Sequence, residues 1–172
     1  MENFSRILNL PIISRVRRNH ALEHATLQIL AKKDLHVSAA GYSDPGGFYI
    51  LGNVSTDTLH EAVSEALHRL QDGEEHLAIH PNCGTNFAAS GLVAGSLAWL
   101  AMLGTRGSMR DKMERWPLVT ILATLGVIFS QPLGPYLQKH FTTDGDVGEL
   151  EVTEITRIER NGAPVHRVKT IH

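Results

Sequence analysis

The spacing of apolar residues predicts a helix in the first half of the chain. Between residues 59 and 70, apolar side chains recur at helical spacing, which is typical of an amphipathic helix packed on a sheet. Ser55, Thr56 and Asp57 precede this segment and offer N-caps. The apolar positions are Leu59, Ala62, Val63, Ala66, Leu67 and Leu70.

Shorter alternating segments predict strands. Residues 35–42 and 48–54 flank the turn sequence SDPGG and form a predicted hairpin, and residues 76–80 alternate like a third strand. Residues 148–171 alternate around an Asn-Gly dipeptide, which is typical of hairpin turns. We expect this C-terminal hairpin to join the same sheet.

A second helix is predicted before the strands, because Asn19 is a good N-cap for a helix that runs to about Lys33. Residues 1–18 mix apolar and basic side chains and can lie on an anionic membrane surface; an ordinary packed segment is the alternative. The predicted fold class is α+β, a small antiparallel sheet with two packed helices. Residues 19–83 supply most of it, and residues 139–172 complete it.

Two long apolar runs, residues 84–105 and 116–138, contain no Asp, Glu, Lys, Arg or His. Each is long enough to cross a hydrocarbon core, which takes about 20 helical residues. The pattern predicts a transmembrane helical hairpin over residues 84–138; a buried hairpin in a soluble protein is the alternative. Gly91 and Gly95 form a GxxxG face, a candidate contact for a homo-oligomer.

Composition narrows the classes of function. The net charge is −2, so no basic surface points to a nucleic-acid partner. Cys83 is the single cysteine, which excludes an internal disulfide, whereas ten histidines are present. The N-terminal sequence does not resemble a signal peptide.

The most informative motif is HALEH. On a helix, His20 and His24 project from one face, one turn apart, and can reach the same metal ion. Glu23 lies beside them and is a candidate base for a metal-bound water. Two solvated histidines on a helix surface are the alternative interpretation.

A zinc site needs a third protein ligand. No Asp or Glu occurs between Glu75 and Asp111, so the thiolate of Cys83 is the candidate donor, with His80 as its rival. A buried apolar role for Cys83 is the alternative. Asp44, before the Pro-Gly-Gly turn, is either a turn former or a substrate contact.

Together these segments resemble a zinc enzyme family. HALEH, a hairpin ending in GGFY, an amphipathic helix and NCGTN are similar to S-ribosylhomocysteine lyase over residues 19–86. The resemblance implies His20, His24 and Cys83 as zinc ligands and Glu23 as acid/base. The HxxEH order also resembles that of inverzincin peptidases.

This sequence departs from the lyase family at one position. That family has a catalytic cysteine shortly before its GFY segment, and Asp44 is the nearest counterpart here. The resemblance therefore implies the metal site rather than the lyase reaction. The whole chain looks more like an uncharacterised bacterial membrane family that shares the HALEHAT and NCGTN motifs.

We therefore expect a membrane-anchored Zn²⁺ hydrolase, peptidase-like, that acts on a protein or peptide near the bilayer. Water would fill the fourth zinc position, and Glu23 would accept its proton. The non-enzymatic alternative is a zinc-stabilised module that binds partners or assists assembly of a membrane complex, with His80 as the fourth ligand. A membrane protein without metal is the third alternative.

The predicted location is the bacterial inner (cytoplasmic) membrane, with membrane lipid as a partner. The loop between the apolar runs is basic, which by the positive-inside rule places the loop in the cytoplasm. The missing export signal and the thiolate ligand favour a cytoplasmic metal domain instead. We expect the latter orientation.

Overall fold

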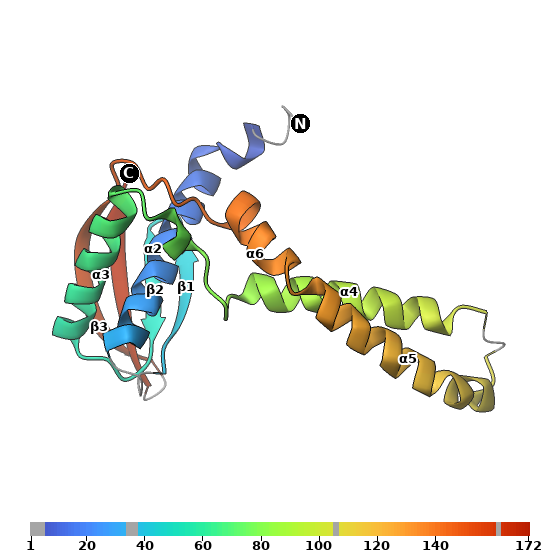
Figure 1. Ribbon diagram of the computed structural model, residues 1–172. Helices are drawn as coiled ribbons and strands as arrows, with labels where there is room; N and C mark the ends of the chain where they lie inside the picture. The colour runs from blue at the N-terminus through green and yellow to red at the C-terminus, as the bar shows by residue number, and fades with distance from the viewer. Residues whose placement is uncertain (1–5, 34–37, 105–106, 161–162) are drawn as a thin grey trace. The chain divides into compact units, whose positions relative to one another are not determined.

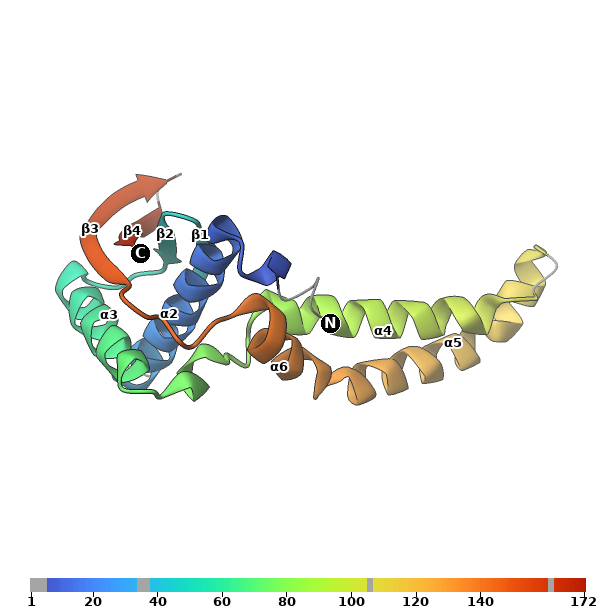
Figure 2. The same ribbon diagram turned by 90° about the horizontal axis from the view of Figure 1, so that it is seen from above.

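The computed structural model describes residues 6–33, 38–104, 107–160 and 163–172. The chain forms two compact units. The first contains Met1–His80 and Gln138–His172, and the second contains Pro81–Leu137. Figure 1 labels helices and strands of both units, and Figure 2 also labels β4.

The first unit is built on an antiparallel sheet of four strands in the order β1-β2-β4-β3. Strands β1 (Ala40–Asp44) and β2 (Gly47–Leu51) form one hairpin, and β3 (Glu151–Arg160) and β4 (Ala163–Ile171) form the other. Strand β4 pairs with β2, so the C-terminal hairpin joins the sheet, as the alternation predicts. The α+β fold class is confirmed; the Asn161-Gly162 turn lies outside the described residues.

Helices α2 (Pro11–Lys33) and α3 (Thr56–Gln71) cover one face of this sheet, as Figure 2 shows. The predicted stripe of α3 is confirmed, because its apolar positions are buried apart from Leu67, which is partly buried. Ser55 is the N-cap, and its side chain accepts a hydrogen bond from the Thr58 N–H at 3.0 Å. The core between helices and sheet includes Leu22, Ile29, Phe48, Ile50, Leu59 and Val168.

Helix α2 begins at Pro11, so the prediction that Asn19 caps it is wrong. Proline suits the first helical turn, where its missing N–H has no partner to lose. Asn19 is instead fully buried in the middle of α2: its Nδ2 donates to the Asp44 carbonyl and its Oδ1 accepts from the Thr170 hydroxyl, both at 2.8 Å. The residue that looked like a local cap therefore joins the helix to strands β1 and β4.

The predicted boundary between residues 18 and 19 is not a structural boundary, because α2 continues through it. Arg17 belongs to the segment predicted either to lie on a membrane surface or to pack, and it pairs with Asp144 at 3.3 Å, with its side chain 12 % exposed. Its guanidinium also donates to the Thr143 carbonyl at 2.9 Å. The Arg17 side chain therefore makes its described contacts within the first unit.

The strands differ from their predicted bounds. Strand β1 starts at Ala40 rather than at residue 35, with residues 34–37 outside the described part of the chain, and it ends at Asp44. Strand β2 runs from Gly47 to Leu51 instead of over 48–54. Asp44 thus belongs to a strand end that leads directly into the tight turn.

The third predicted strand, residues 76–80, is wrong, because a short 3-10 helix, η1 (Glu75–Ala78), stands there. Its neighbouring backbone carbonyls bond to side chains rather than to another strand. Gln28 donates to the carbonyls of Leu77 and Ile79, and His24 donates to that of Ala78. Side chains from α2 thus satisfy the backbone that a sheet would otherwise have to pair.

The second unit contains two long apolar helices, α4 (Gly84–Met102) and α5 (Met109–Ser130), followed by the short α6 (Leu133–Leu137). Both long helices have the length and composition to span a membrane. Helix α5 begins seven residues before the predicted run at 116–138 and ends at Ser130, eight residues before the end of that run. Gln131 and Pro132 connect it to α6. The charged sequence RDKMER therefore lies in its first turns.

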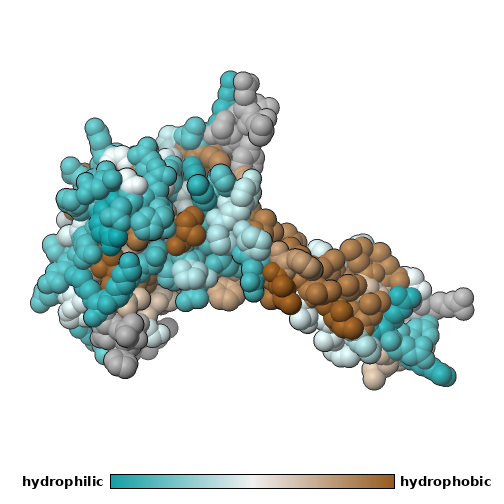
Figure 3. Space-filling view, in the orientation of Figure 1, coloured by the Kyte–Doolittle hydropathy of each residue, from teal (hydrophilic) through white to brown (hydrophobic). Residues whose placement is uncertain are grey.

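The surface of these two helices is apolar apart from the charged first turns of α5. Only 11 % of the residues in the most apolar 18-residue stretch of each helix are buried, whereas a core helix of a soluble protein is mostly buried. Figure 3 shows the apolar surface in brown. Large exposed side chains, each 64–71 % exposed, are Phe87, Leu92, Trp99, Trp116 and Phe129.

Small residues bring α4 and α5 together. A Cβ on Gly126 would collide with the backbone of Ala94, and the Ser130 hydroxyl donates to that of Ser90 at 2.8 Å. Gly91 and Gly95 are not part of this contact. Within the described residues, a Cβ on either glycine would meet no heavy atom within 4 Å.

Candidate metal centre

The two histidines of HALEH lie one turn apart on α2, with ring centroids 4.1 Å apart. His20 Nδ1 bonds to the Thr142 carbonyl at 2.9 Å, and His24 Nδ1 bonds to the Ala78 carbonyl at 2.7 Å. A carbonyl only accepts hydrogen bonds, so each Nδ1 must carry the proton. In an uncharged ring of this tautomer, Nε2 carries the lone pair with which imidazole binds a metal.

Cys83 completes a set of three ligand atoms. Its sulfur and one nitrogen each of His20 and His24 all lie within 4.8 Å of one another, close enough to hold a metal ion. Ligand atoms around tetrahedral zinc stand about 3.5 Å apart, so small side-chain rotations would close the set. Cys83 is also the N-cap of α4, where its sulfur accepts the Thr85 N–H at 3.4 Å.

His80 stands next to this set. Its ring centroid is 5.4 Å from that of His24, and it precedes Cys83 by three residues. Burial lowers the pKa of His80 to about 4, and the nearby His24 and His20 lower it in the same direction. At neutral pH its imidazole is uncharged, as a metal ligand must be.

Glu23 is a buried carboxylate, 4 % exposed, that faces strand β1. The Ser43 hydroxyl donates to its Oε2 at 2.5 Å. Gly41, two residues earlier on the same face of β1, leaves room for the carboxylate, because a Cβ there would overlap it. The sequence analysis did not identify Ser43 or Gly41. Their spacing of two residues indicates that they share one face of a strand, but it does not indicate that this face contacts Glu23.

Asp44 is held by a salt bridge. Arg167 donates to both of its carboxylate oxygens, at 2.8 and 2.9 Å, and the Arg167 guanidinium lies 4.4 Å from the centre of the Tyr49 ring. Burial raises the pKa of Asp44, but the hydrogen bonds from Arg167 and the Gly46 N–H outweigh it and lower the pKa overall. A substrate contact at Asp44, which stays a prediction, would compete with this pair.

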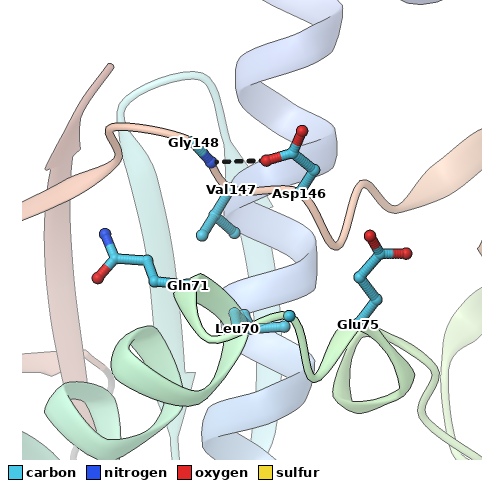
Figure 4. Close-up of a pocket in the computed structure, with 7 residues that line it drawn as sticks. Leu70, Gln71, Glu75, Asp146, Val147 and Gly148 are labelled. Carbon is cyan, nitrogen blue, oxygen red and sulfur yellow. Dashed lines mark hydrogen bonds between the residues drawn. The ribbon is translucent and has the colours of Figure 1, made fainter.

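The first unit also has a pocket of about 160 Å³ that lies apart from these residues. Figure 4 shows its lining, which comes from the end of α3, the start of η1 and the segment before β3 and contains none of the predicted site residues. One of its two carboxylates, that of Asp146, accepts the Gly148 N–H at 3.2 Å. Two acidic side chains alone do not define a ligand.

Comparison with known proteins places the chain in a family. A protein family described as a domain of unknown function, DUF6391, matches residues 15–155. The chain belongs to the DUF6391 family. The match spans the HALEH helix, Cys83 and both apolar helices of this DUF6391 protein.

A relative from Picosynechococcus sp. (strain ATCC 27264 / PCC 7002 / PR-6), described as an uncharacterized protein, is 34 % identical over 169 residues. The similarity covers 90 % of the DUF6391 chain and 78 % of the relative. No solved structure matches the chain. These comparisons establish the family. Any inference about the chemistry of the protein therefore rests on the geometry of the candidate site.

Proposed function

We propose that this protein is a membrane-anchored zinc hydrolase of the peptidase type. The observation that carries the proposal is the pair of oriented imidazoles, each fixed by a carbonyl at Nδ1, together with a thiolate donor in reach of the same ion. Histidines on a solvated helix surface would not need two such anchors. The alternative of two solvated histidines is therefore disfavoured.

The donor set argues for zinc in particular. Two imidazole nitrogens and one thiolate suit zinc, whereas calcium and magnesium prefer oxygen ligands. Three protein ligands leave one position of a tetrahedral ion for water, the arrangement typical of catalytic sites. Bound zinc would supply Lewis acidity and lower the pKa of that water toward about 7.

Glu23 supports hydrolysis over a purely structural role. A zinc ion with four protein ligands needs no carboxylate base, whereas Glu23 is a buried carboxylate next to His24 in the sequence, and its hydrogen bond from Ser43 fixes its orientation. As general base, Glu23 would take a proton from the attacking water. A peptide carbonyl is the substrate group on which this acid–base and metal chemistry typically acts.

The membrane assignment rests on the two apolar helices. Their large exposed side chains suit hydrocarbon, and Cys83 directly precedes α4. If α4 spans the bilayer, its N-cap lies near the membrane surface, which favours a membrane-proximal protein or peptide substrate. We propose the bacterial cytoplasmic membrane, with the metal domain on the cytoplasmic side.

His80 favours a second candidate function. With its uncharged ring near that of His24, it could fill the fourth position and give a closed site of three histidines and one cysteine. The protein would then be a zinc-stabilised module that binds partners or assists assembly of a membrane complex. Glu23 distinguishes the two, because the closed site does not need it.

Metal content tests the site itself. The full chain is purified in detergent without added metal, and zinc is measured in the wild type, His24→Ala, Glu23→Gln and His60→Ala. His60 is an exposed histidine on α3 and serves as the matched control. We expect about one zinc per chain except in His24→Ala; equal zinc in all four proteins, or none, would reject the site.

Hydrolysis tests the reaction. The same four proteins in lipid vesicles are mixed with quenched fluorescent peptides, with and without a zinc chelator. We expect cleavage by the wild type and the His60→Ala control, loss of cleavage with chelator, and zinc-loaded but inactive Glu23→Gln. Zinc-loaded wild type that cleaves no peptide, or that cleaves no faster than zinc-loaded Glu23→Gln, would favour the structural module instead.

A further inference from the structure

The chain segment over residues 77–80, shortly before Cys83, is held by side chains. Four consecutive carbonyls, those of residues 77–80, each accept a hydrogen bond from a side chain. Gln28 and His24 on α2 bind the first three. The fourth belongs to His80 and is bound from a different part of the chain.

Gln138 makes that fourth contact and adds a second one. Its Nε2 donates to the His80 carbonyl at 3.1 Å, and its Oε1 accepts the His80 N–H at 2.8 Å. A carboxamide carries a donor and an acceptor side by side, so glutamine can bind both backbone groups of one residue. Gln138 is fully buried, which makes any loss of these bonds costly.

Gln138 is also the first residue of η2 (Gln138–Thr142), a π-helical turn. Its own carbonyl accepts the N–H of Thr143 at 3.0 Å and the Thr143 hydroxyl at 2.9 Å, which fixes the end of the turn. At that end, the Thr142 carbonyl accepts the hydrogen bond from His20 Nδ1. One turn therefore contacts the backbone of His80 with its first residue and a ligand imidazole with its last.

The contact between His80 and Gln138 joins two positions on either side of the apolar helices. His80 is the last residue of the first unit before the apolar helices, and Gln138 is the first residue after them. The bonds between them tie the outgoing chain to the returning chain within that unit. Cys83 follows His80 by only three residues, so fixing His80 limits where the cysteine sulfur can lie.

We propose that Gln138 is a positioning residue of the metal site, which holds the ligand segment after His80 in place for metal binding. The proposal rests on the metal site proposed above and adds that residues after the apolar hairpin organise it. Residues 20–83 supply the ligands, and η2 orients them. The set reaches its binding geometry only when the chain has returned through the hairpin and formed η2.

The experiment measures metal binding by the full chain in detergent. Zinc affinity is determined by chelator competition for the wild type, Gln138→Ala, Gln138→Glu and Gln71→Ala. Gln71 is the matched control, an exposed glutamine whose one described bond, to the Leu150 carbonyl, is long at 3.4 Å. Cobalt is then bound in place of zinc, and the thiolate-to-cobalt absorption is recorded at saturation.

We expect Gln138→Ala to bind zinc 10–100-fold more weakly, the usual effect of losing a group that orients a ligand. Its thiolate-to-cobalt absorption should weaken even at saturation. Gln138→Glu retains the acceptor for the His80 N–H but places a buried carboxylate oxygen against the His80 carbonyl, so it should bind zinc at least as weakly as Gln138→Ala. Gln71→Ala should match the wild type in both measurements.

Two results would overturn the proposal separately from the proposed function. Zinc affinity within twofold of the wild type in Gln138→Ala would show that Gln138 does not position the site. A weaker affinity with an unchanged cobalt spectrum, matched by an equal loss of metal-free thermal stability, would indicate general destabilisation. A wild type that binds neither metal would instead reject the metal site itself.

Discussion

The two units use apolar side chains in opposite ways. In the first unit, Leu22, Phe48 and Ile50 are completely buried between helices and sheet. In the second, Leu92 and Phe129 are each 71 % exposed. The first arrangement is stabilised by removing apolar surface from water, whereas the second suits a hydrocarbon surrounding. The position of a side chain, rather than its type, therefore decides what a substitution will cost.

The largest expected effect compares two phenylalanines. Phe48→Ala removes a fully buried ring from the core and should lower the free energy of unfolding of the first unit by about 3–5 kcal/mol. Phe87→Ala, on α4 at 68 % exposure, should change it by less than about 0.5 kcal/mol. Denaturant unfolding in detergent measures both. Equal losses would contradict the division into a packed core and an apolar outer surface.

The second prediction compares two leucines. Leu92→Arg lies in the middle of α4 and should disfavour membrane insertion by about 2.5–3.5 kcal/mol, the cost of a central charge in a spanning helix. Leu51→Arg, on β2 at 44 % exposure, should leave insertion unchanged. The fraction of protein that resists alkaline extraction from membranes measures this. If Leu92→Arg stays in the membrane fraction like the wild type, α4 does not span the bilayer.

The third prediction compares two glycines. Gly41→Ala places a Cβ against the Glu23 carboxylate and should destabilise the first unit by about 1–3 kcal/mol, as overpacking does. Gly95→Ala meets no described atom within 4 Å and should be neutral or slightly stabilising, because alanine favours helix. Thermal unfolding of both variants measures the difference. An unaffected Gly41→Ala would mean that Glu23 is not held against β1.

The fourth prediction is a pH dependence of the metal-free first unit. The pKa of His80 is about 4 in the folded chain and ordinarily 6.5, so the unfolded chain takes up its proton first as pH falls. Stability should therefore be highest above pH 6.5 and decline toward pH 4. Burial lowers the pKa values of His166 and His172 as well, which adds to the same slope.

Unfolding in the presence of chelator, measured across this pH range, checks the prediction. His80→Gln should flatten the slope, and His60→Gln, an exposed control on α3, should not. No histidine occurs between residues 84 and 138, so the apolar helices should contribute nothing to this dependence of stability on pH. An unchanged slope in His80→Gln would contradict the lowered pKa.

Periodic patterns in the sequence predicted the elements whose cause is local. The stripe of α3 and its Ser55 cap, the position of His20 and His24 on one helix face, and the two apolar helices all follow from spacing or composition. The period of a helix or strand is a property of neighbouring residues, so it can be recognised without knowing the fold.

The wrong predictions share a different cause. Asn19 has the side chain of an N-cap, and residues 76–80 alternate like a strand, but their hydrogen bonds go to partners distant in the sequence. Asparagine can satisfy a helix end or a buried strand equally well, and a backbone carbonyl accepts from any donor within reach. Local pattern cannot choose between such partners.

The sequence by itself therefore determined the α+β class, the apolar hairpin and the ligand types of the candidate site. Tertiary structure alone decided how that site is held: carbonyls orient both imidazoles, Ser43 and Gly41 receive Glu23, and Gln138 binds His80. The physical reason is that side-chain chemistry is encoded residue by residue. Its orientation depends on groups that only folding brings together.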